Sequence, residues 1–222
     1  MDDLVLVIGN KNYSSWSLRP WLVMRHFDIP FKEVRIPLYR EDSREALAKL
    51  SPSGLVPALK NSGVTVWDSL AICEYLQELY PSLALWPKDR DDRAIARSIS
   101  AEMHSGFSAL RNHMPMNCRK VFPGKGLNPD TQADIKRVSQ IWRECREKHP
   151  EGGPMLFGEF TIADAMFAPV ALRFNTYDVQ LDSVAESYVS TILAMPEMQD
   201  WVSAAKQETE VLADFEPYEK KG

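Results

Sequence analysis

The sequence has no long hydrophobic run and no basic run. Nothing in its 222 residues approaches the roughly 18 consecutive apolar residues of a membrane-spanning helix. The apolar run Leu4–Ile8 is also too short for the core of a signal peptide. The 26 Lys and Arg residues are interspersed with 31 Asp and Glu residues, which leaves a net charge of −5. We therefore expect no membrane and no nucleic acid as a partner, and favour a small molecule or a protein.

Cysteine is scarce as well. Cys73, Cys118 and Cys145 are odd in number and form no CxxC pair. This usage indicates free thiols in a reducing compartment and predicts a cytoplasmic protein. His104 and His113 have no Cys, Asp or Glu neighbours at metal-ligand spacing, so we expect no metal site.

The first 81 residues alternate between strand and helix patterns. A chain of this length with 45% hydrophobic residues can form two domains, each with a core. Asn61-Ser62-Gly63 is a turn sequence that suits an antiparallel hairpin. In chain order the patterns predict strand 4–8, helix 16–27, strand 31–36, helix 43–50, strands 56–60 and 64–67, and helix 70–80.

The second half of the chain has helical patterns only. Two prolines and a charge run at residues 81–92 predict a linker, which we place at 82–92. The helices expected beyond it are one long helix at 93–114, then 130–148, 161–174, 185–194 and 197–207, with a loop at 117–129. The predicted fold class is thus α/β plus all-α, with domains at 1–81 and 93–222.

Ser14 and Ser15 stand just before the first predicted helix. Small hydroxyl residues at this place commonly cap a helix, which is a purely structural role. A helix N-terminus also favours a bound anion, and a serine hydroxyl can donate a hydrogen bond to a thiolate there. Local sequence leaves both interpretations open.

Two further motifs have the same ambiguity. Pro57 either begins an edge strand, or forms a cis bond that leaves the backbone of Val56 facing an extended peptide ligand. Asp68 and Ser69 either cap a helix or hold the two charges of an amino-acid terminus. In the second case the Asp68 carboxylate takes the ammonium, and Ser69 with the helix N-terminus takes the carboxylate.

Together these motifs resemble the thioredoxin-like half of cytosolic glutathione transferases. The resemblance rests on the order Ser14-Ser15-x-Ser17, Ser51-Pro52-x-Gly54-x-Val56-Pro57-x-Leu59 and Asp68-Ser69-x-Ala71-Ile72-x-x-Tyr75-Leu76. Phe160-Thr161-Ile162-Ala163-Asp164 is similar to that family's buried capping motif, in which Thr161 caps a helix and Asp164 returns the bond.

Within that family the serine motif is most similar to the zeta class, whose members include maleylacetoacetate isomerases. This chain has Trp16 where that class has a cysteine, and Leu18 where it has a tryptophan. Because no cysteine lies in the motif, a cysteine-type redox transferase is excluded at that position.

The resemblance implies a thioredoxin-like N-terminal domain, a helical-bundle C-terminal domain and a glutathione site. Ser14, with Ser15 as the second choice, would contact the thiol, and Val56 with Pro57 would bind the cysteinyl backbone. Asp68 and Ser69 would bind the γ-glutamyl end. The glycine carboxylate would pair with Arg40, Arg44 or Lys49, and the candidates for the second-substrate pocket are Trp16, Phe107, Arg111, Asn112 and His113.

The expected function is conjugation of the glutathione thiolate to small electrophilic substrates, with glutathione as co-substrate and no metal. One alternative is a glutathione-dependent cis-trans isomerase of the maleylacetoacetate type, which would need pocket cations such as Arg19 and Arg111. Another is a non-catalytic glutathione-binding or regulatory protein. The resemblance also implies a homodimer.

Overall fold

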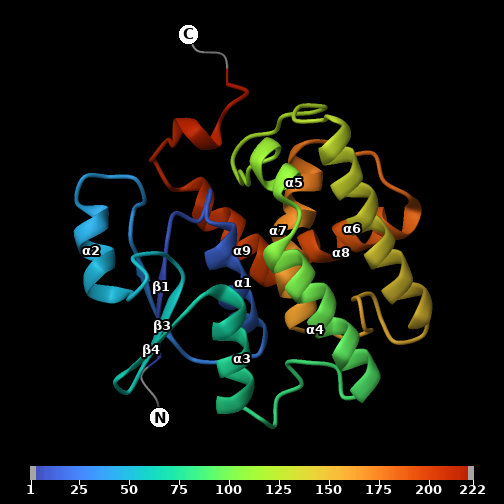
Figure 1. The fold of residues 1–222 in the computed structure, drawn as a ribbon, viewed down its shortest axis with the longest axis horizontal. Coiled ribbons are helices and arrows are strands. Elements are labelled where there is room, and N and C mark those ends of the chain that lie inside the picture. The colour runs from blue at the N-terminus through green and yellow to red at the C-terminus, as the bar shows by residue number, and fades with distance from the viewer. Residues whose placement is uncertain (1–3, 220–222) are drawn as a thin grey trace.

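The N-terminal half contains one small mixed sheet with helices beside it (Figure 1). The structure is a computed structural model that describes residues 4–219, so residues 1–3 and 220–222 of the expected domains lie outside it. The strands have the order β2-β1-β3-β4. β1 is parallel to β2 and antiparallel to β3, which pairs antiparallel with β4. Their bounds are β1 (Val5–Ile8), β2 (Lys32–Arg35), β3 (Ala58–Asn61) and β4 (Val64–Trp67).

Three helices complete this half and confirm the predicted element order: α1 (Ser15–His26), α2 (Ser43–Leu50) and α3 (Ser69–Leu79). β1 is buried between its neighbours, with Leu6, Val7 and Ile8 fully inaccessible, as its continuous apolar run predicts. The hairpin between β3 and β4 turns at Ser62 and Gly63, and both have positive φ. The arrangement agrees with the expected thioredoxin-like domain.

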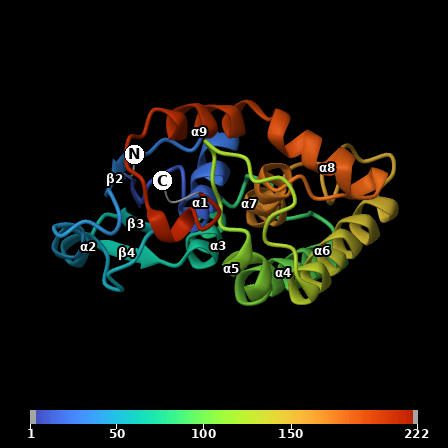
Figure 2. The ribbon, with the colours of Figure 1, turned by 90° about the horizontal axis from the view of Figure 1, so that it is seen from above.

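The second half is helical and is organised around α7. Nearly every residue of α7 is buried, and it packs against α1, α4 and α8. Figure 2 shows α9 running beside α1, so the last helix joins the two halves. The helices are α4 (Arg90–Ser105), α5 (Ser108–His113), α6 (Pro129–Lys148), α7 (Ile162–Thr176), α8 (Ser183–Ala194) and α9 (Pro196–Lys206).

The expected capping motif of α7 is present. Thr161 is the N-cap, and the buried Asp164 carboxylate accepts from the Thr161 N–H at 2.9 Å, which forms a capping box. The same carboxylate accepts from the Leu156 N–H and from the Tyr188 hydroxyl, each at 3.0 Å. Asp164 therefore ties three segments of the helical core together.

The prediction of one long helix at 93–114 is wrong. The chain leaves the helix at Gly106, which is extended (φ −98°, ψ −164°), and Phe107 is left-handed (φ 57°). A new helix, α5, follows, and its Leu110 N–H bonds to the Asp134 carboxylate at 2.9 Å. α4 also begins at Arg90, inside the expected linker, because the Asp89 carboxylate caps the N–H groups of Asp91 and Asp92.

A C-terminal segment, residues 207–219, follows α9 and returns to the N-terminal half. It contains one turn of 3-10 helix, η1 (Ala213–Phe215). Figure 1 shows it in red, above the sheet and close to the start of α1. The sequence pattern predicts no structure beyond residue 207.

Candidate active site

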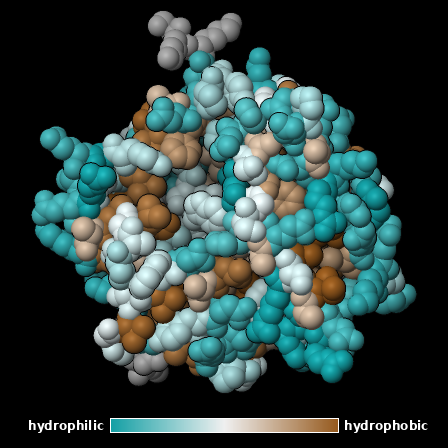
Figure 3. Space-filling view, viewed as in Figure 1, coloured by the Kyte–Doolittle hydropathy of each residue, from teal (hydrophilic) through white to brown (hydrophobic). Residues whose placement is uncertain are grey.

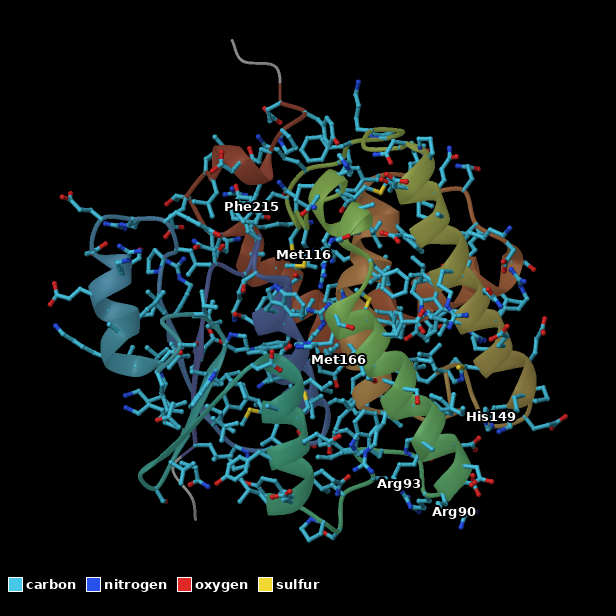
Figure 4. The ribbon with its side chains drawn as sticks, in the orientation of Figure 1. Arg90, Arg93, Met116, His149, Met166 and Phe215 are labelled. Atoms are coloured by element: carbon cyan, nitrogen blue, oxygen red, sulfur yellow. The ribbon has the colours of Figure 1, made fainter. Side chains whose placement is uncertain are left out.

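The expected site residues border two adjoining cavities between the halves. The larger has a volume of about 640 Å³ and the smaller about 520 Å³. The space-filling view shows the surface hollowed between the two halves, with hydrophobic side chains at the rim (Figure 3). Met116 and Phe215 line the larger cavity and lie close to each other in Figure 4. Both cavities share the side chains of Trp16, Leu55, Val56 and Arg111.

Ser14 and Ser15 line the larger cavity at the N-terminus of α1. Ser14 is the N-cap: its Oγ accepts from the Ser17 N–H at 3.4 Å and donates to the Ser17 Oγ at 2.8 Å. The Ser15 Oγ accepts a hydrogen bond from Arg173 Nη2 at 3.3 Å. The Ser14 hydroxyl is thus engaged in the cap, whereas Ser15 lies beside a buried cation.

The Val56–Pro57 peptide bond is cis, as one of the two interpretations of this proline predicts. Strand pairing of β3 begins at Ala58, so Val56 lies outside the ladder. Its side chain borders both cavities. An extended ligand along this edge would meet the backbone of Val56.

Asp68 caps α3 and faces the smaller cavity. Its Oδ1 accepts from the N–H groups of Leu70 and Ala71, and its Oδ2 lies 3.0 Å from His104 Nε2. The backbone of Asp68 has φ 76°, a left-handed conformation that is costly for a residue with a side chain and is often found at ligand sites. The Ser69 Oγ is buried and has no hydrogen-bond partner among residues 4–219. A carboxylate, an uncommitted hydroxyl and a helix N-terminus therefore meet here.

Three arginines surround the serine motif. Arg19 is fully buried and Arg173 is 4% exposed; each donates Nε to a backbone carbonyl, of Met166 and Met114 respectively. Arg111 borders both cavities and Arg173 borders the larger one, whereas Arg19, named in the sequence analysis as a pocket cation, borders neither. Within residues 4–219 none of the three forms an ion pair with a carboxylate. The charges of Asp68 and Asp134 act on Arg19 and Arg111 only from beyond ion-pair distance.

Trp16 lies between two of these arginines. The Arg19 guanidinium is 4.2 Å from its ring centroid, and that of Arg111 is 5.3 Å away. Burial, and then the charge of Arg173, lower the pKa of Arg19. Burial lowers the pKa of Arg173 to about 10, so that side chain remains cationic at neutral pH. Arg19 Nη2 and Arg173 Nη1 are buried without hydrogen-bond partners among the described residues. Only Arg173 borders a cavity, where an anion would satisfy its free donor.

The cavities contain only part of the expected second-substrate wall. Trp16 and Arg111 line them, but Phe107 is in the hydrophobic core, and Asn112 and His113 lie outside both linings. The break between α4 and α5 falls within the segment that contains these residues. The lining also includes side chains that the sequence reading did not select: Tyr13, Tyr39, Met116, Arg173 and Phe215.

Of the three bases proposed for the glycine carboxylate, Arg40 and Arg44 line the larger cavity. Lys49 does not; it pairs with Glu45 at 2.6 Å on the surface of α2. Across residues 4–219 no group of three His, Cys, Asp or Glu side chains is placed to hold a metal ion. In the same part of the chain, no helix has the length and apolar character to cross a membrane.

Comparison with known proteins identifies the family. Residues 13–79 match the glutathione S-transferase N-terminal domain. Maleylacetoacetate isomerase of Rattus norvegicus is 40% identical over 178 residues, which cover 77% of this chain and 78% of that protein. The chain belongs to the glutathione S-transferase family. This glutathione transferase is therefore a glutathione-dependent enzyme with glutathione as its co-substrate.

Other relatives agree with this assignment. Maleylpyruvate isomerase of Ralstonia is 27% identical over 180 residues, covering 77% of this chain and 85% of that protein. Two solved structures share the fold of this glutathione transferase. A glutathione transferase homolog from Burkholderia with bound glutathione has a TM-score of 0.72 at 23% identity, covering 93% of this chain and all of that one. Holo maleyl pyruvate isomerase, a bacterial Zeta-class transferase, has a TM-score of 0.69 at 21% identity with the same coverage.

Proposed function

We propose that this enzyme adds the glutathione thiolate to small electrophiles that carry carboxylate groups. The observation that carries the proposal is the pair Arg111 and Arg173 in the cavity wall, neither of which forms an ion pair with a carboxylate of the described residues. Buried guanidinium groups with free donors favour an anionic partner, and carboxylates match their planar geometry. Conjugation forms a sulfur–carbon bond, and the electrophile then releases a leaving group or takes up a proton.

Ser15 is the proposed hydroxyl donor to the thiolate, with Ser14 as the alternative. The Ser14 hydroxyl already donates its hydrogen bond to Ser17 Oγ. The Ser15 hydroxyl donates to no group among residues 4–219, and its Oγ lies 3.3 Å from Arg173 Nη2. A free thiol with a pKa near 8.5 is ionised to only a few per cent at pH 7. A charge-assisted hydrogen bond, the cation and the helix N-terminus all favour the ionised form.

We propose that the remaining contacts fix glutathione along the two cavities. Val56 with Pro57 would hold the cysteinyl backbone, and Asp68 with Ser69 the γ-glutamyl end. Arg40 or Arg44 would meet the glycine carboxylate. Support for these roles comes from their place in the cavity walls. A homodimer in the cytoplasm, both typical of the family, completes the proposal.

Isomerisation of an unsaturated diacid is the second proposed activity. Here the thiolate adds to a double bond, rotation follows, and the thiolate leaves again, so glutathione is regenerated. Arg111 and Arg173 favour it too, because a cis diacid presents two carboxylates on one side. The relatives from Rattus norvegicus and Ralstonia are both named as isomerases of maleyl compounds.

Calorimetry tests the glutathione site. The parent is expected to bind glutathione with a Kd between micromolar and millimolar, and Asp68→Ala to weaken binding by about tenfold, since it removes a charged contact. Arg97→Gln is the matched control, because Arg97 pairs with Glu74 on the surface away from the cavities. A parent that does not bind glutathione refutes the proposal.

Product analysis separates the two activities and tests the arginines. With a maleyl-type cis diacid, a trans product with no net loss of glutathione indicates isomerisation, and a stable adduct indicates conjugation. Arg173→Gln is expected to raise KM for the diacid at least about tenfold and to leave KM for a neutral electrophile nearly unchanged. Equal changes for both substrates would refute the anion-binding role.

A further inference from the structure

The C-terminal segment, residues 207–219, holds the loop that leads into the serine motif. The Glu208 carboxylate accepts from the N–H groups of Lys11 (2.7 Å) and Asn12 (3.0 Å). Arg119 donates to the carbonyls of Glu208 and Glu210. The segment is thereby joined to the loop after β1 on one side and to the helical half on the other.

Glu216 is the point where both halves meet this segment. Its carboxylate is 5% exposed and accepts from the Tyr13 hydroxyl at 2.6 Å. It also accepts from Asn117 Nδ2 at 3.2 Å and from Lys120 Nζ at 2.7 Å. A buried carboxylate needs such partners, since its desolvation is costly. Burial raises the pKa of Glu216, but the hydrogen bonds from Lys120, Tyr13 and Asn117 together lower it further, so the net pKa is lowered and the group is ionised at neutral pH.

Tyr13 transmits this anchoring to the site, because it is the residue next to Ser14. The N–H groups of Tyr13 and Ser14 both bond to the Asn10 carbonyl, which links these two residues within the turn before α1. The Tyr13 hydroxyl also accepts from Arg119 Nη2 at 2.8 Å and from the Leu212 N–H at 3.3 Å. Of these partners, Glu216 and Leu212 belong to the C-terminal segment, and Arg119 belongs to the loop between α5 and α6.

We propose that Glu216 is a positioning residue for the thiol site: through Tyr13 it fixes the loop that places Ser14 and Ser15 against the glutathione sulfur. This inference rests on the proposed function of the serines. The neighbouring residue Phe215 (Figure 4) lines the larger cavity, and its ring centroid lies 5.7 Å from that of Tyr13. The C-terminal segment therefore contacts both the cavity and the loop before α1. A displacement of a catalytic group by an ångström is enough to lower turnover by up to a hundredfold.

The test compares Glu216→Gln with Glu219→Gln in the full chain. Glu219 pairs with the same Lys120, at 2.8 Å, but is 46% exposed and has no bond to Tyr13, which makes it a matched control. Glu216→Gln is expected to lower kcat about tenfold at neutral pH. It is also expected to raise the thiol pKa of bound glutathione, read from thiolate absorbance, with KM for glutathione changed less than threefold. Glu219→Gln is expected to match the parent in every reading.

If the hydrogen bonds of Glu216 serve only stability, Glu216→Gln would lower the melting temperature but leave the thiol pKa and the kcat of the folded protein unchanged. That result would overturn the inference. Tyr13→Phe, which removes only the connecting hydroxyl, is expected to reproduce the shift, and the double variant to add nothing to it. Tyr13→Phe also decides the matter if Glu216→Gln does not fold. A parent without glutathione binding refutes the proposed function, whereas an active parent with insensitive variants refutes only the role of Glu216.

Discussion

Ser15→Ala is the substitution that tests the thiol-activation scheme most directly. Ser15 is 5% exposed, lines the larger cavity and has the Arg173 guanidinium at 3.3 Å. The substitution removes a hydrogen bond to the thiolate but leaves the helix N-terminus and the cation in place. We expect the thiol pKa of bound glutathione to rise, because the ionised form loses a stabilising contact.

The size of the effect follows from the hydrogen bond. A bond to a charged group contributes about 1.5–3 kcal/mol, and one pKa unit corresponds to about 1.36 kcal/mol, so the expected rise is about one to two units. If the thiol titrates near 6.5 in the parent complex, the variant would titrate between about 7.5 and 8.5. The thiolate fraction at pH 7 then falls from about three quarters to between about one quarter and a few per cent. Turnover at neutral pH falls in the same proportion, by about three- to 25-fold, and recovers as the pH rises through the new pKa.

The assay is the pH dependence of kcat at saturating glutathione, together with thiolate absorbance of the binary complex. Ser14→Ala is the companion variant. It removes the cap of α1, and is expected to cost stability of about 0.5–2 kcal/mol with a smaller shift of the profile. If the Ser15→Ala profile superimposes on that of the parent while the Ser14→Ala profile moves, Ser14 is the donor. If neither profile moves, no serine hydroxyl activates the thiol.

Two further substitutions test the pocket wall and the helical core. Phe215→Ala is expected to raise KM for an apolar electrophile by about three- to tenfold, because apolar contact is lost, and Phe215→Leu is expected to raise it less. Steady-state kinetics measures both values, and an unchanged KM would mean that this side chain does not contact the substrate. Asp164→Ala leaves several buried donors without an acceptor and is expected to lower the free energy of unfolding by about 3–5 kcal/mol in urea titration. The folded fraction should keep the parent's specific activity, and a loss below about 1 kcal/mol would contradict the structural role of this carboxylate.

The features that the sequence alone determined are those encoded over short distances. The apolar run of β1 and the Ser62-Gly63 turn each depend on a few adjacent residues. The same holds for the capping box of Thr161 and Asp164, whereas the cis bond before Pro57 was one of two interpretations that the sequence left open. Local backbone preferences and side-chain patterns decide such elements. The family's glutathione motifs were visible for the same reason, since each lies at the start of one helix or strand.

Tertiary structure decided the features that join distant positions. Arg173 reaches Ser15 across 158 positions, and Glu216 reaches Tyr13 across 203. No local sequence pattern identifies either residue as part of the site. Arg173 lies on α7, which is buried on nearly all sides, and Glu216 lies in a segment without periodicity, so each has many possible partners. The start of α5 after the break at Gly106 likewise depends on a distant element, because the Leu110 N–H of α5 bonds to Asp134 of α6. Adjacent residues thus specify most of the elements and the serine motif. The charges around that motif depend on the packing of α7 and α9 against α1 and on the hydrogen bonds of the C-terminal segment, because these contacts join positions far apart in the chain.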